Sequence, residues 1–482
     1  MARRVAIDPV SRVEGHGKVT LTVDDDNHIT EARLHIVEFR GFEKFIQGRP
    51  YWELPLVVQR LCGICPVSHH LAAAKAIDQI AGVDQLTEAA LALRKLMHFA
   101  QVLQSHALHF FHLASPDLLF GFDSDTAKRN IVAVINHHQA LALHGVKIRK
   151  FGQQVIEAIS GKRIHGIAAV PGGMNQALTA EKIRPFQQQV GDIIDWCDDT
   201  VQTVKNLYLC NRPFHDNFGT APAAFMSLVG PQDQLELYDG ELKVVDPEGK
   251  TTHRHPCPQY HTLLKEQVKS WSYMKFPFLS NLEPETGWYR VGPLARLNTC
   301  SHIDTPKAEQ RRQEYINTLG TPVQAPLAYH WSRMIEALHC AEAIKKLLEN
   351  PALLSDDLLN QGNKRREGVG IIEAPRGTLI HHYRINDDDQ VTMANLIVST
   401  TNNNQAMNES IRKVANEHLD GKTLTPELLN LVEVAIRAYD PCLSCATHAA
   451  GRMPLELELR ESDGKRLQSL LRNSDGNLVH AD

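Results

Sequence analysis

The chain has 482 residues with a formal net charge of −5, and 43% of the residues are hydrophobic while 22% are charged. This composition is that of a globular protein and argues against intrinsic disorder and against a coiled coil. The small negative charge gives no signal for nucleic acid or an anionic membrane surface. No apolar run of 18 residues occurs, so we expect no membrane span.

Nine cysteines are present, of which four form two CxxC pairs and the others are scattered singly. This pattern is not that of a disulfide scaffold and favours a reducing compartment with metal or redox chemistry. The first ten residues, MARRVAIDPV, contain two arginines but no apolar segment behind them, so they do not predict a signal peptide. We therefore expect a cytoplasmic location.

The first half of the chain predicts one hairpin and then long helices. Val19–Val23 and Ile29–Val37 are β-prone runs on either side of an Asx-rich turn. Helical periodicity follows over Thr87–Ser115, with Thr87 as the expected N-cap and Pro116 as the expected end. Two further helical patterns cover Ile131–Ser160 and Ile183–Cys210.

The second half predicts short strands between helices. Leu235–Tyr238 and Leu242–Val245 indicate a small β excursion, and Gly377–Arg384 with Val391–Thr400 forms a second hairpin candidate. In the tail, Leu455–Leu459 alternates apolar and charged residues, as a half-exposed strand does. Helical patterns cover Thr305–Thr318, Trp331–Glu349 and Pro426–Tyr439. The expected fold class is mainly α with small β hairpins or sheets near the N-terminal and C-terminal parts.

The two CxxC motifs lie at opposite ends of the chain, and each is followed by a histidine. A CxxC turn places both sulfurs on the same side, so each pair can offer two thiolates to one metal. Four thiolates select zinc, iron–sulfur, copper(I) or nickel. The residues concerned are Cys62, Cys65 and His69 near the N-terminus, and Cys442, Cys445 and His448 near the C-terminus.

Three kinds of site fit these motifs. A structural zinc site commonly separates its two knuckles by roughly 15–20 residues, far less than the separation here. A thioredoxin-like redox pair needs a βαβ setting, which surrounds neither motif. The spacing alone leaves a structural zinc site and a buried catalytic metal site open.

The residues around the cysteines carry a resemblance. Arg60–His69 reads RLCGICPVSH and Asp440–His448 reads DPCLSCATH. The two segments resemble the RxCGxCxxxH and DPCxxCxxH signatures of nickel–iron hydrogenase large subunits. Four other segments resemble family motifs in family order, so that the resemblance covers essentially the whole chain: Arg12–His16, Arg40–Glu43, Pro171–Gly173 and Glu373–Gly377. Val37–Phe45 is most similar to the cytoplasmic, bidirectional, NAD-reducing type.

The resemblance implies a nickel–iron hydrogenase large-subunit fold, with a single catalytic domain over residues 1–448. It implies reversible splitting of H2 into protons and electrons. The implied cofactor is one nickel and one iron that carries carbon monoxide and cyanide. Cys62 and Cys442 match the terminal nickel ligands, and Cys65 and Cys445 match the bridging thiolates.

Two further residues match family positions in catalysis. Glu14 matches the glutamate that carries the proton away, a role in which burial raises the pKa of a carboxyl towards the working pH. Its alternative is a salt-bridged surface glutamate between Arg12 and His16. Arg376 matches the arginine above the open metal position, with fixed charge and donors. Its alternative is an ordinary loop arginine.

The resemblance also implies residues that contact the metal ligands. His69 is expected to hydrogen-bond a cysteine sulfur and tune the metal. Thr400 or Thr401 is expected to donate to an iron-bound cyanide, although threonine in a strand is more often a β-former. Ser399 stands where many relatives carry proline.

The resemblance also implies a magnesium site. Glu43, the backbone carbonyl of Leu396 and His448 match its ligands. Magnesium prefers oxygen, so the histidine ligand rests on the family alone. For Glu43 the alternative is a solvated charge beside Lys44.

The remaining histidines and cysteines favour structural roles. His106, His109 and His112 recur every three residues, which indicates a buried or interfacial helix face more than a metal site. The single cysteines are expected to pack as small apolar residues: Cys197, Cys210, Cys257, Cys300 and Cys340.

The chain shows no electron carrier. It has no GxGxxG after a strand, no Walker loop and no further cysteine set for an iron–sulfur cluster. An iron–sulfur small subunit is therefore implied, and flavin- and NAD-binding diaphorase subunits follow if the NAD-reducing type applies. Alternatives are another acceptor such as a deazaflavin, or a non-catalytic zinc-stabilised subunit like the quinone-reductase core subunits, which lack the four cysteines.

Relatives are made as precursors that a maturation endopeptidase cuts after the histidine of the C-terminal motif. Here the cut would fall between His448 and Ala449 and remove residues 449–482. The alternative is that these residues form a permanent C-terminal strand and turn.

Overall fold

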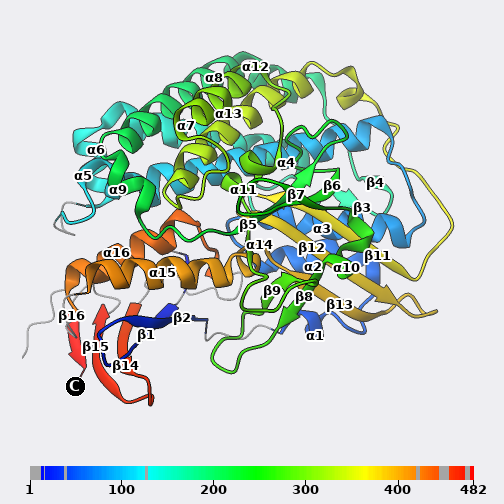
Figure 1. Cartoon of the computed structure of the whole chain (residues 1–482). Helices are drawn as coiled ribbons and strands as arrows, with labels where there is room; N and C mark the ends of the chain where they lie inside the picture. Colours follow the sequence, from blue (N-terminus) through cyan, green and yellow to red (C-terminus); the bar gives the residue numbers. More distant parts are fainter. Residues whose placement is uncertain are drawn as a thin grey trace, which may run out of the picture.

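The computed structural model describes residues 12, 14–15, 17–36, 41–124, 129–419, 424–443, 455–472 and 478–481. Long helices form its upper layer in Figure 1, above several small sheets. Within this layer α13 packs against α8 and α4, and α7 packs against α4 and α8. The four are α4 (Glu88–Leu108), α7 (Gln139–Ser160), α8 (Ala180–Leu209) and α13 (Ala328–Leu348). The sequence-based fold class, mainly α with small sheets, is confirmed.

The helix predicted from Thr87 begins as expected and continues past its expected end. The Thr87 hydroxyl accepts a hydrogen bond from the amide of Ala90 at 3.2 Å. After α4 the chain makes a π-helical segment, His109–Ala114, and then α5, Ser115–Phe120. The prediction that Pro116 ends the helix is wrong, because proline lies in the first turn of α5, where it gives up no helical hydrogen bond.

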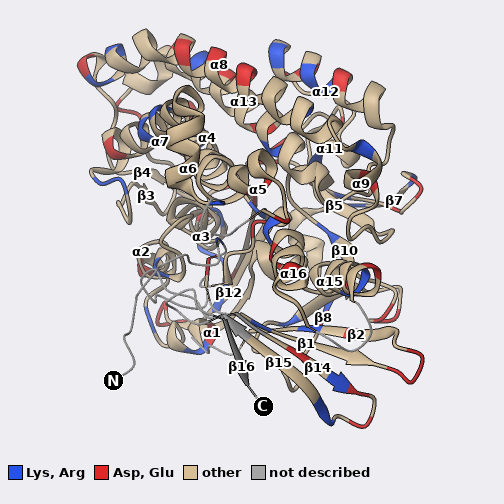
Figure 2. Ribbon diagram, turned by 90° about the vertical axis from the view of Figure 1, so that its left-hand side faces the viewer, with Lys and Arg blue, Asp and Glu red and all other residues tan. Residues whose placement is uncertain are grey.

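Most other predicted helices are confirmed with shifted ends. The segment Ile131–Ser160 divides into α6 (Ile131–His137) and α7, because His138 leaves the helical conformation. α8 begins earlier than predicted, since the side chain of Thr179 caps it. The other three predictions correspond to α12 (Pro306–Leu319), α13 and α16 (Pro426–Ala438). Figure 2 shows basic and acidic residues interspersed along α8 and α12.

Two sheets lie beneath the helices. The four-stranded sheet has the order β10-β5-β6-β7 and the three-stranded sheet the order β11-β12-β13. Helix α3, Pro66–Ile80, packs on β11 and β12. Glycine at position 370 of β11 allows α3 to lie close to the strand. A Cβ at this position would lie 1.9 Å from the carbonyl oxygen of Ala72 in α3. The strands are β5 (Ala224–Val229), β6 (Glu241–Val245), β7 (Thr251–Pro256), β10 (Tyr289–Arg290), β11 (Glu367–Ala374), β12 (Gly377–Ile385) and β13 (Val391–Ile397).

A five-stranded sheet joins the two ends of the chain, with the order β16-β15-β14-β1-β2. The predicted N-terminal hairpin is confirmed, and β1 pairs in parallel with β14, the predicted tail strand. Helix α15, Asn404–His418, covers β2 and packs against α16 (Figure 1). The strands are β1 (Gly17–Val23), β2 (Ile29–His35), β14 (Leu455–Glu461), β15 (Arg466–Arg472) and β16 (Leu478–Ala481).

Two strand predictions need correction. Leu235–Tyr238 is not a strand, because the Glu236 carboxylate accepts the amides of Leu237 and Tyr238 and holds a local turn. The second hairpin is confirmed as β12 and β13, but it ends at Ile397. Ser399–Asn402 forms the short helix α14, so Thr400 is not a strand residue.

The remaining elements are short connections. No helix in the described part of the chain is both long and apolar enough to cross a membrane. The helices are α1 (Phe42–Phe45), η1 (Tyr51–Glu53), α2 (Leu54–Val58), η2 (Gln59–Leu61), α9 (Arg212–Asn217), η4 (Cys257–Gln259), α10 (Tyr260–Leu263), α11 (Pro293–Thr299) and η5 (Pro351–Leu354), and the strands are β3 (Ala169–Val170), β4 (Gly173–Met174), β8 (Leu264–Gln267) and β9 (Phe276–Leu279).

Candidate metal centre

The first CxxC motif is a tight turn that leads into α3. Cys62 is extended, and Pro66 begins α3 directly after Cys65. The turn directs the amides of Ile64 and Cys65 at Cys62 Sγ, at 3.3 and 3.0 Å. These two contacts fix the position of the Cys62 sulfur within the turn.

Cys442 of the second motif is held between the N-terminal segment and α14. Its amide donates to the Thr400 hydroxyl at 3.0 Å. Glu14 and Cys442 form an isolated parallel bridge, and the amide of Leu443 donates to the Glu14 carbonyl at 2.9 Å. The carbonyl-to-amide contact fixes the backbone of Glu14 beside a cysteine that lies more than 400 positions later.

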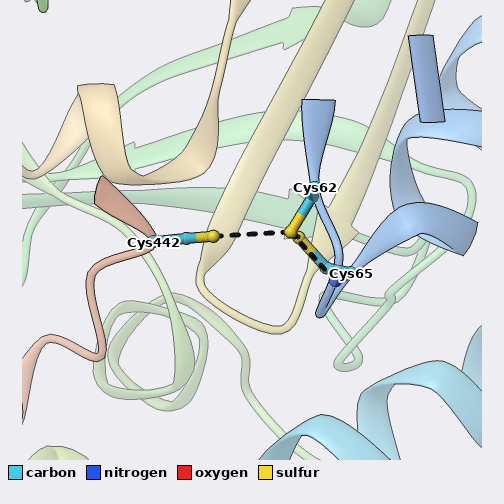
Figure 3. A group of neighbouring side chains, drawn as sticks. All are labelled: Cys62, Cys65 and Cys442. Carbon is cyan, nitrogen blue, oxygen red and sulfur yellow. Dashed lines mark hydrogen bonds between the residues drawn. The ribbon is translucent and has the colours of Figure 1, made fainter. Parts of the chain in front are cut away.

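The structure brings three of the four predicted cysteines together (Figure 3). Cys62 Sγ lies 2.9 Å from Cys65 Sγ and 3.4 Å from Cys442 Sγ. All three residues are buried, and their sulfurs lie within 4.8 Å of one another. Cys445 and His448 lie outside the described residues. Three buried sulfurs at these separations fit a soft or borderline metal ion, since adjacent thiolates repel each other without one.

Arg376 lies over the cysteines, in the turn between β11 and β12. Its Nη2 donates to Asp440 Oδ1 at 3.0 Å and its Nη1 to Ser105 Oγ at 3.3 Å. Burial alone would lower the pKa of the guanidinium, but Asp440 and the three cysteines hold that pKa well above its usual value. Arg376 therefore supplies a permanent positive charge at the cysteines.

A small cavity of about 10 Å³ joins these groups. Its lining includes Cys65, Cys442, Arg376, His69 and Thr400. Sulfur, guanidinium, imidazole and hydroxyl groups thus face one enclosed space.

A buried ionic network fixes the turn that carries Arg376. Arg296 donates to both oxygens of Glu336 at 2.6 Å and to Glu373 Oε2 at 2.6 Å. It also donates to the carbonyls of Ala374 and Pro375, at 3.1 and 3.2 Å. The two residues that precede Arg376 are therefore tied to a charged core through Arg296.

Glu14 has a different setting from the one its sequence neighbours suggest. Arg12 donates to the carbonyl of Leu113 at 2.7 Å and pairs with the buried Asp117. His16 lies outside the described residues. Glu14 itself is half-buried beside Cys442.

Glu43 lies in a cluster of charged side chains beside β13, together with Glu266 and Lys275. Lys275 Nζ contacts Glu43 Oε1 at 3.1 Å and Glu266 Oε2 at 3.4 Å. The Leu396 amide donates to Glu43 Oε1 at 2.9 Å. Because the amide and the carbonyl of one residue in an antiparallel strand point to the same side, the Leu396 carbonyl faces this cluster too.

The cluster has oxygen donors that would suit magnesium. Glu266 Oε1 is buried with no partner among the described residues, and burial raises the pKa of this carboxyl. Lys44, the expected neighbour of Glu43, instead bonds Gln47.

His106 and His109 lie on a buried face, as expected, whereas His112 is only partly buried. His106 bonds Glu336 at 2.7 Å and His109 donates to the Arg437 carbonyl at 2.9 Å. Among the described residues, the three cysteines are the only group of histidine, cysteine and acidic side chains arranged to hold a metal. Of the single cysteines, Cys197, Cys300 and Cys340 are buried as predicted, but Cys210 is exposed, because it follows the last turn of α8.

Several site residues are missing from the sequence prediction. Asp440 precedes Cys442 in the second motif, and that position is a signal that could have identified it. It is buried and adopts a left-handed conformation with φ of 52°. Ser105, Arg296 and Lys275 reach the site only through tertiary contacts, so no local pattern marks them.

Comparison with known proteins identifies the family. The model of the nickel-dependent hydrogenases matches residues 40–120 and 236–448, and a HoxL-like model matches residues 4–39. The chain is 44% identical to the beta subunit of the NAD-reducing hydrogenase HoxS of Cupriavidus necator, over 98% of this chain and 100% of that one.

Solved structures agree. A crystal structure of an NAD+-reducing NiFe-hydrogenase in the H2-reduced state is 53% identical, with a TM-score of 0.88, and the match covers 93% of this chain and 100% of that one. The Ni-Fe-Se hydrogenase from D. vulgaris Hildenborough shares the fold, with a TM-score of 0.74 at 23% identity over 92% and 99% of the two chains. The chain described here thus belongs to the family of nickel-dependent hydrogenases.

Proposed function

We propose that this chain is the catalytic subunit of a hydrogenase that reversibly splits H2 at a nickel–iron centre, with electrons passing through partner subunits to NAD+. The observation that carries this proposal is the meeting of Cys62, Cys65 and Cys442 within 4.8 Å under the charge of Arg376. The likeness to an NAD-reducing hydrogenase subunit supports the acceptor.

We assign Cys62 and Cys442 as terminal nickel ligands, and Cys65 and Cys445 as bridging ligands. When bound, the centre supplies the redox and Lewis-acid chemistry that cleaves H2, and its iron is expected to carry carbon monoxide and cyanide. Soft thiolates stabilise several nickel oxidation states. The amides of Ile64 and Cys65 donate to the sulfur of Cys62 and help to orient that ligand.

The chain's own polar groups have distinct roles. Arg376 holds a fixed positive charge at the cavity without giving up its proton. Glu14 takes a proton from the cysteine region, because its backbone is held beside Cys442. The Thr400 hydroxyl accepts from the Cys442 amide, so its hydrogen is left to donate into the cavity, the position expected for a bond to cyanide.

A magnesium ion at the Glu43 cluster would be held by Glu43 and the Leu396 carbonyl, with His448 as the third protein ligand. The oxygen donors of this cluster suit magnesium, which binds few protein groups and keeps several waters. Lys275 would then turn from Glu43 towards Glu266.

Electrons need carriers, and the sequence has no motif for one. We propose an iron–sulfur small subunit as the first acceptor and flavin- and NAD-binding diaphorase subunits beyond it, in the cytoplasm, where NAD+ is available.

We also propose that residues 1–448 are the mature catalytic domain and that an endopeptidase removes residues 449–482. The tail strand β14 pairs with β1, and β1 begins a few residues after Glu14, which bridges Cys442. The tail therefore lies beside the segments that would close over the metal. A mature active subunit that still ends at Asp482 by intact mass would contradict the cleavage.

The test of function uses the purified complex. Nickel and iron in about equal amounts, H2-dependent reduction of NAD+, and infrared bands of carbon monoxide and cyanide are expected. Cys65→Ser should lose nickel and activity, because a hard oxygen donor replaces a soft thiolate. Cys340→Ser, which changes a buried cysteine outside the cluster, should keep both. An active Cys65→Ser enzyme with intact metal would refute the assignment.

A further inference from the structure

A chain of three buried polar rings runs from the cysteine cavity into the β12 strand. His69 Nδ1 lies 3.2 Å from His381 Nε2, and His381 Nδ1 lies 2.6 Å from the hydroxyl oxygen of Tyr383. The three residues are at most 1% exposed. His69 lines the cavity together with Cys65 and Cys442.

The fold accounts for this chain. His381 and Tyr383 are two positions apart on β12, so both side chains point to the same face of the strand. Helix α3 packs on that strand and presents His69 to it, with the rings of His69 and His381 5.4 Å apart. The chain is thus a product of how α3 packs against the sheet.

The order of hydrogens along the chain follows from the chemistry of imidazole. A neutral histidine carries one N–H and one acceptor nitrogen. Burial lowers the pKa of His381 well below its usual value, so this ring is neutral. Tyr383 belongs to an apolar cluster with Ile77, Ile80 and Leu396, so His381 Nδ1 is the available acceptor for its hydroxyl hydrogen.

One order satisfies every group. The Tyr383 hydroxyl donates to His381 Nδ1, and His381 Nε2–H donates to His69 Nδ1. The hydrogen of His69 then sits on Nε2. The reverse order leaves the Tyr383 hydroxyl hydrogen in an apolar cluster, without an acceptor among the described residues.

We propose that Tyr383 and His381 are positioning residues that hold His69 in the tautomer with its N–H on Nε2, directed at the cysteine sulfurs. This inference rests on the proposed metal centre. A hydrogen bond to a metal-bound thiolate withdraws electron density from the sulfur and raises the reduction potential of the metal. Tyr383 therefore tunes that potential through His381 and His69.

Tyr383→Phe tests the proposal, because it removes one hydroxyl and keeps the ring. In the purified complex, the midpoint potential of the nickel electron paramagnetic resonance signal should fall. The infrared bands of the iron-bound carbon monoxide and cyanide should shift, because they respond to the electron density on the cysteine sulfurs. Tyr315→Phe is the matched control, since Tyr315 is 1% exposed and its hydroxyl has no partner among the described residues. The control should titrate at the wild-type potential.

A double variant shows whether the effect passes through His69. In His69→Gln the side-chain amide nitrogen takes the place of Nε2 and donates whatever Tyr383 does. Adding Tyr383→Phe to that protein should cause no further shift in potential. A further shift equal to that in the wild-type background would overturn the role of His69.

The failures of the two proposals can be told apart. Wild-type complex without nickel or hydrogen turnover contradicts the proposed function. If the wild type is loaded with metal and active but Tyr383→Phe leaves the midpoint potential unchanged, only the proposal that Tyr383 and His381 fix the tautomer of His69 is contradicted. If Tyr383→Phe does not accumulate, His381→Phe replaces it, because it removes the N–H that donates to His69 Nδ1. The same fall in potential is expected, while an unchanged potential overturns the proposal.

Discussion

Replacement of Arg296 by lysine should loosen the turn that carries Arg376. Arg296 makes five hydrogen bonds, three to carboxylate oxygens and two to backbone carbonyls, and its side chain is fully buried. Lysine keeps the charge but has three donors on one atom and no planar fork. At least two charged hydrogen bonds are lost.

The cost follows from the kind of bond. Hydrogen bonds to charged groups contribute about 1.5–3 kcal/mol each, so Arg296→Lys should lower the free energy of unfolding by about 3–6 kcal/mol. Amide hydrogen exchange measures this loss of stability directly, since every 1.4 kcal/mol raises the exchange rate of the most protected amides about tenfold. The most protected amides of β11 and β12 should therefore exchange at least about a hundred times faster.

Arg254→Lys is the matched control. Arg254 also bonds two carboxylates, Glu241 at 2.5 Å and Asp233 at 2.7 Å, but its side chain is 35% exposed. Exposed pairs contribute up to about 1 kcal/mol, so exchange should rise less than about fivefold. The reasoning fails if Arg296→Lys leaves exchange in β11 and β12 near the wild-type rate, or if the surface variant has an equal effect.

Three further outcomes are expected. In thermal unfolding, Gly370→Ala should destabilise the protein by about 1–3 kcal/mol or more, because the new methyl group overlaps the Ala72 carbonyl of α3. Gly191→Ala, which has open space around it in α8, should stabilise the protein slightly, and equal effects of the two variants would contradict the close packing. Burial lowers the pKa of His70, His98 and His339 to about 4, below the unfolded value of 6.5, so the unfolded state binds protons first and stability should fall as the pH drops from 6.5 towards 4, by at most about 3 kcal/mol per histidine. Denaturant unfolding at pH 7.5 and 5 measures this, and equal stability at both would refute it. Glu14→Gln should abolish H2/D2O exchange while the metal content stays normal; exchange at the wild-type rate would move the proton route elsewhere.

The sequence predicts the elements that depend on local patterns. Thr87 is recognisable as an N-cap, and the Asx-rich turn between β1 and β2 is confirmed by the Asp24 carboxylate, which accepts two amides beyond it. Helices α3 and α15 are absent from the sequence prediction. α3 is buried on nearly every side, so it has no polar face to mark a helical period.

The site is predictable as far as motifs reach. The two CxxC motifs identify Cys62, Cys65 and Cys442, and the structure brings these three together. The partners of Arg376, by contrast, come from α4 and from the segment after α16, which meet only through the packing of the whole core. The pairing of Glu43 with Lys275 likewise joins segments that share no local pattern.

The central claim is that the cysteines of both motifs hold nickel. X-ray absorption at the nickel edge of the purified complex tests it most directly. The account predicts stoichiometric nickel in a sulfur-dominated coordination shell, lost in Cys442→Ser. Zinc in place of nickel, or nickel bound mainly by nitrogen and oxygen, would contradict it.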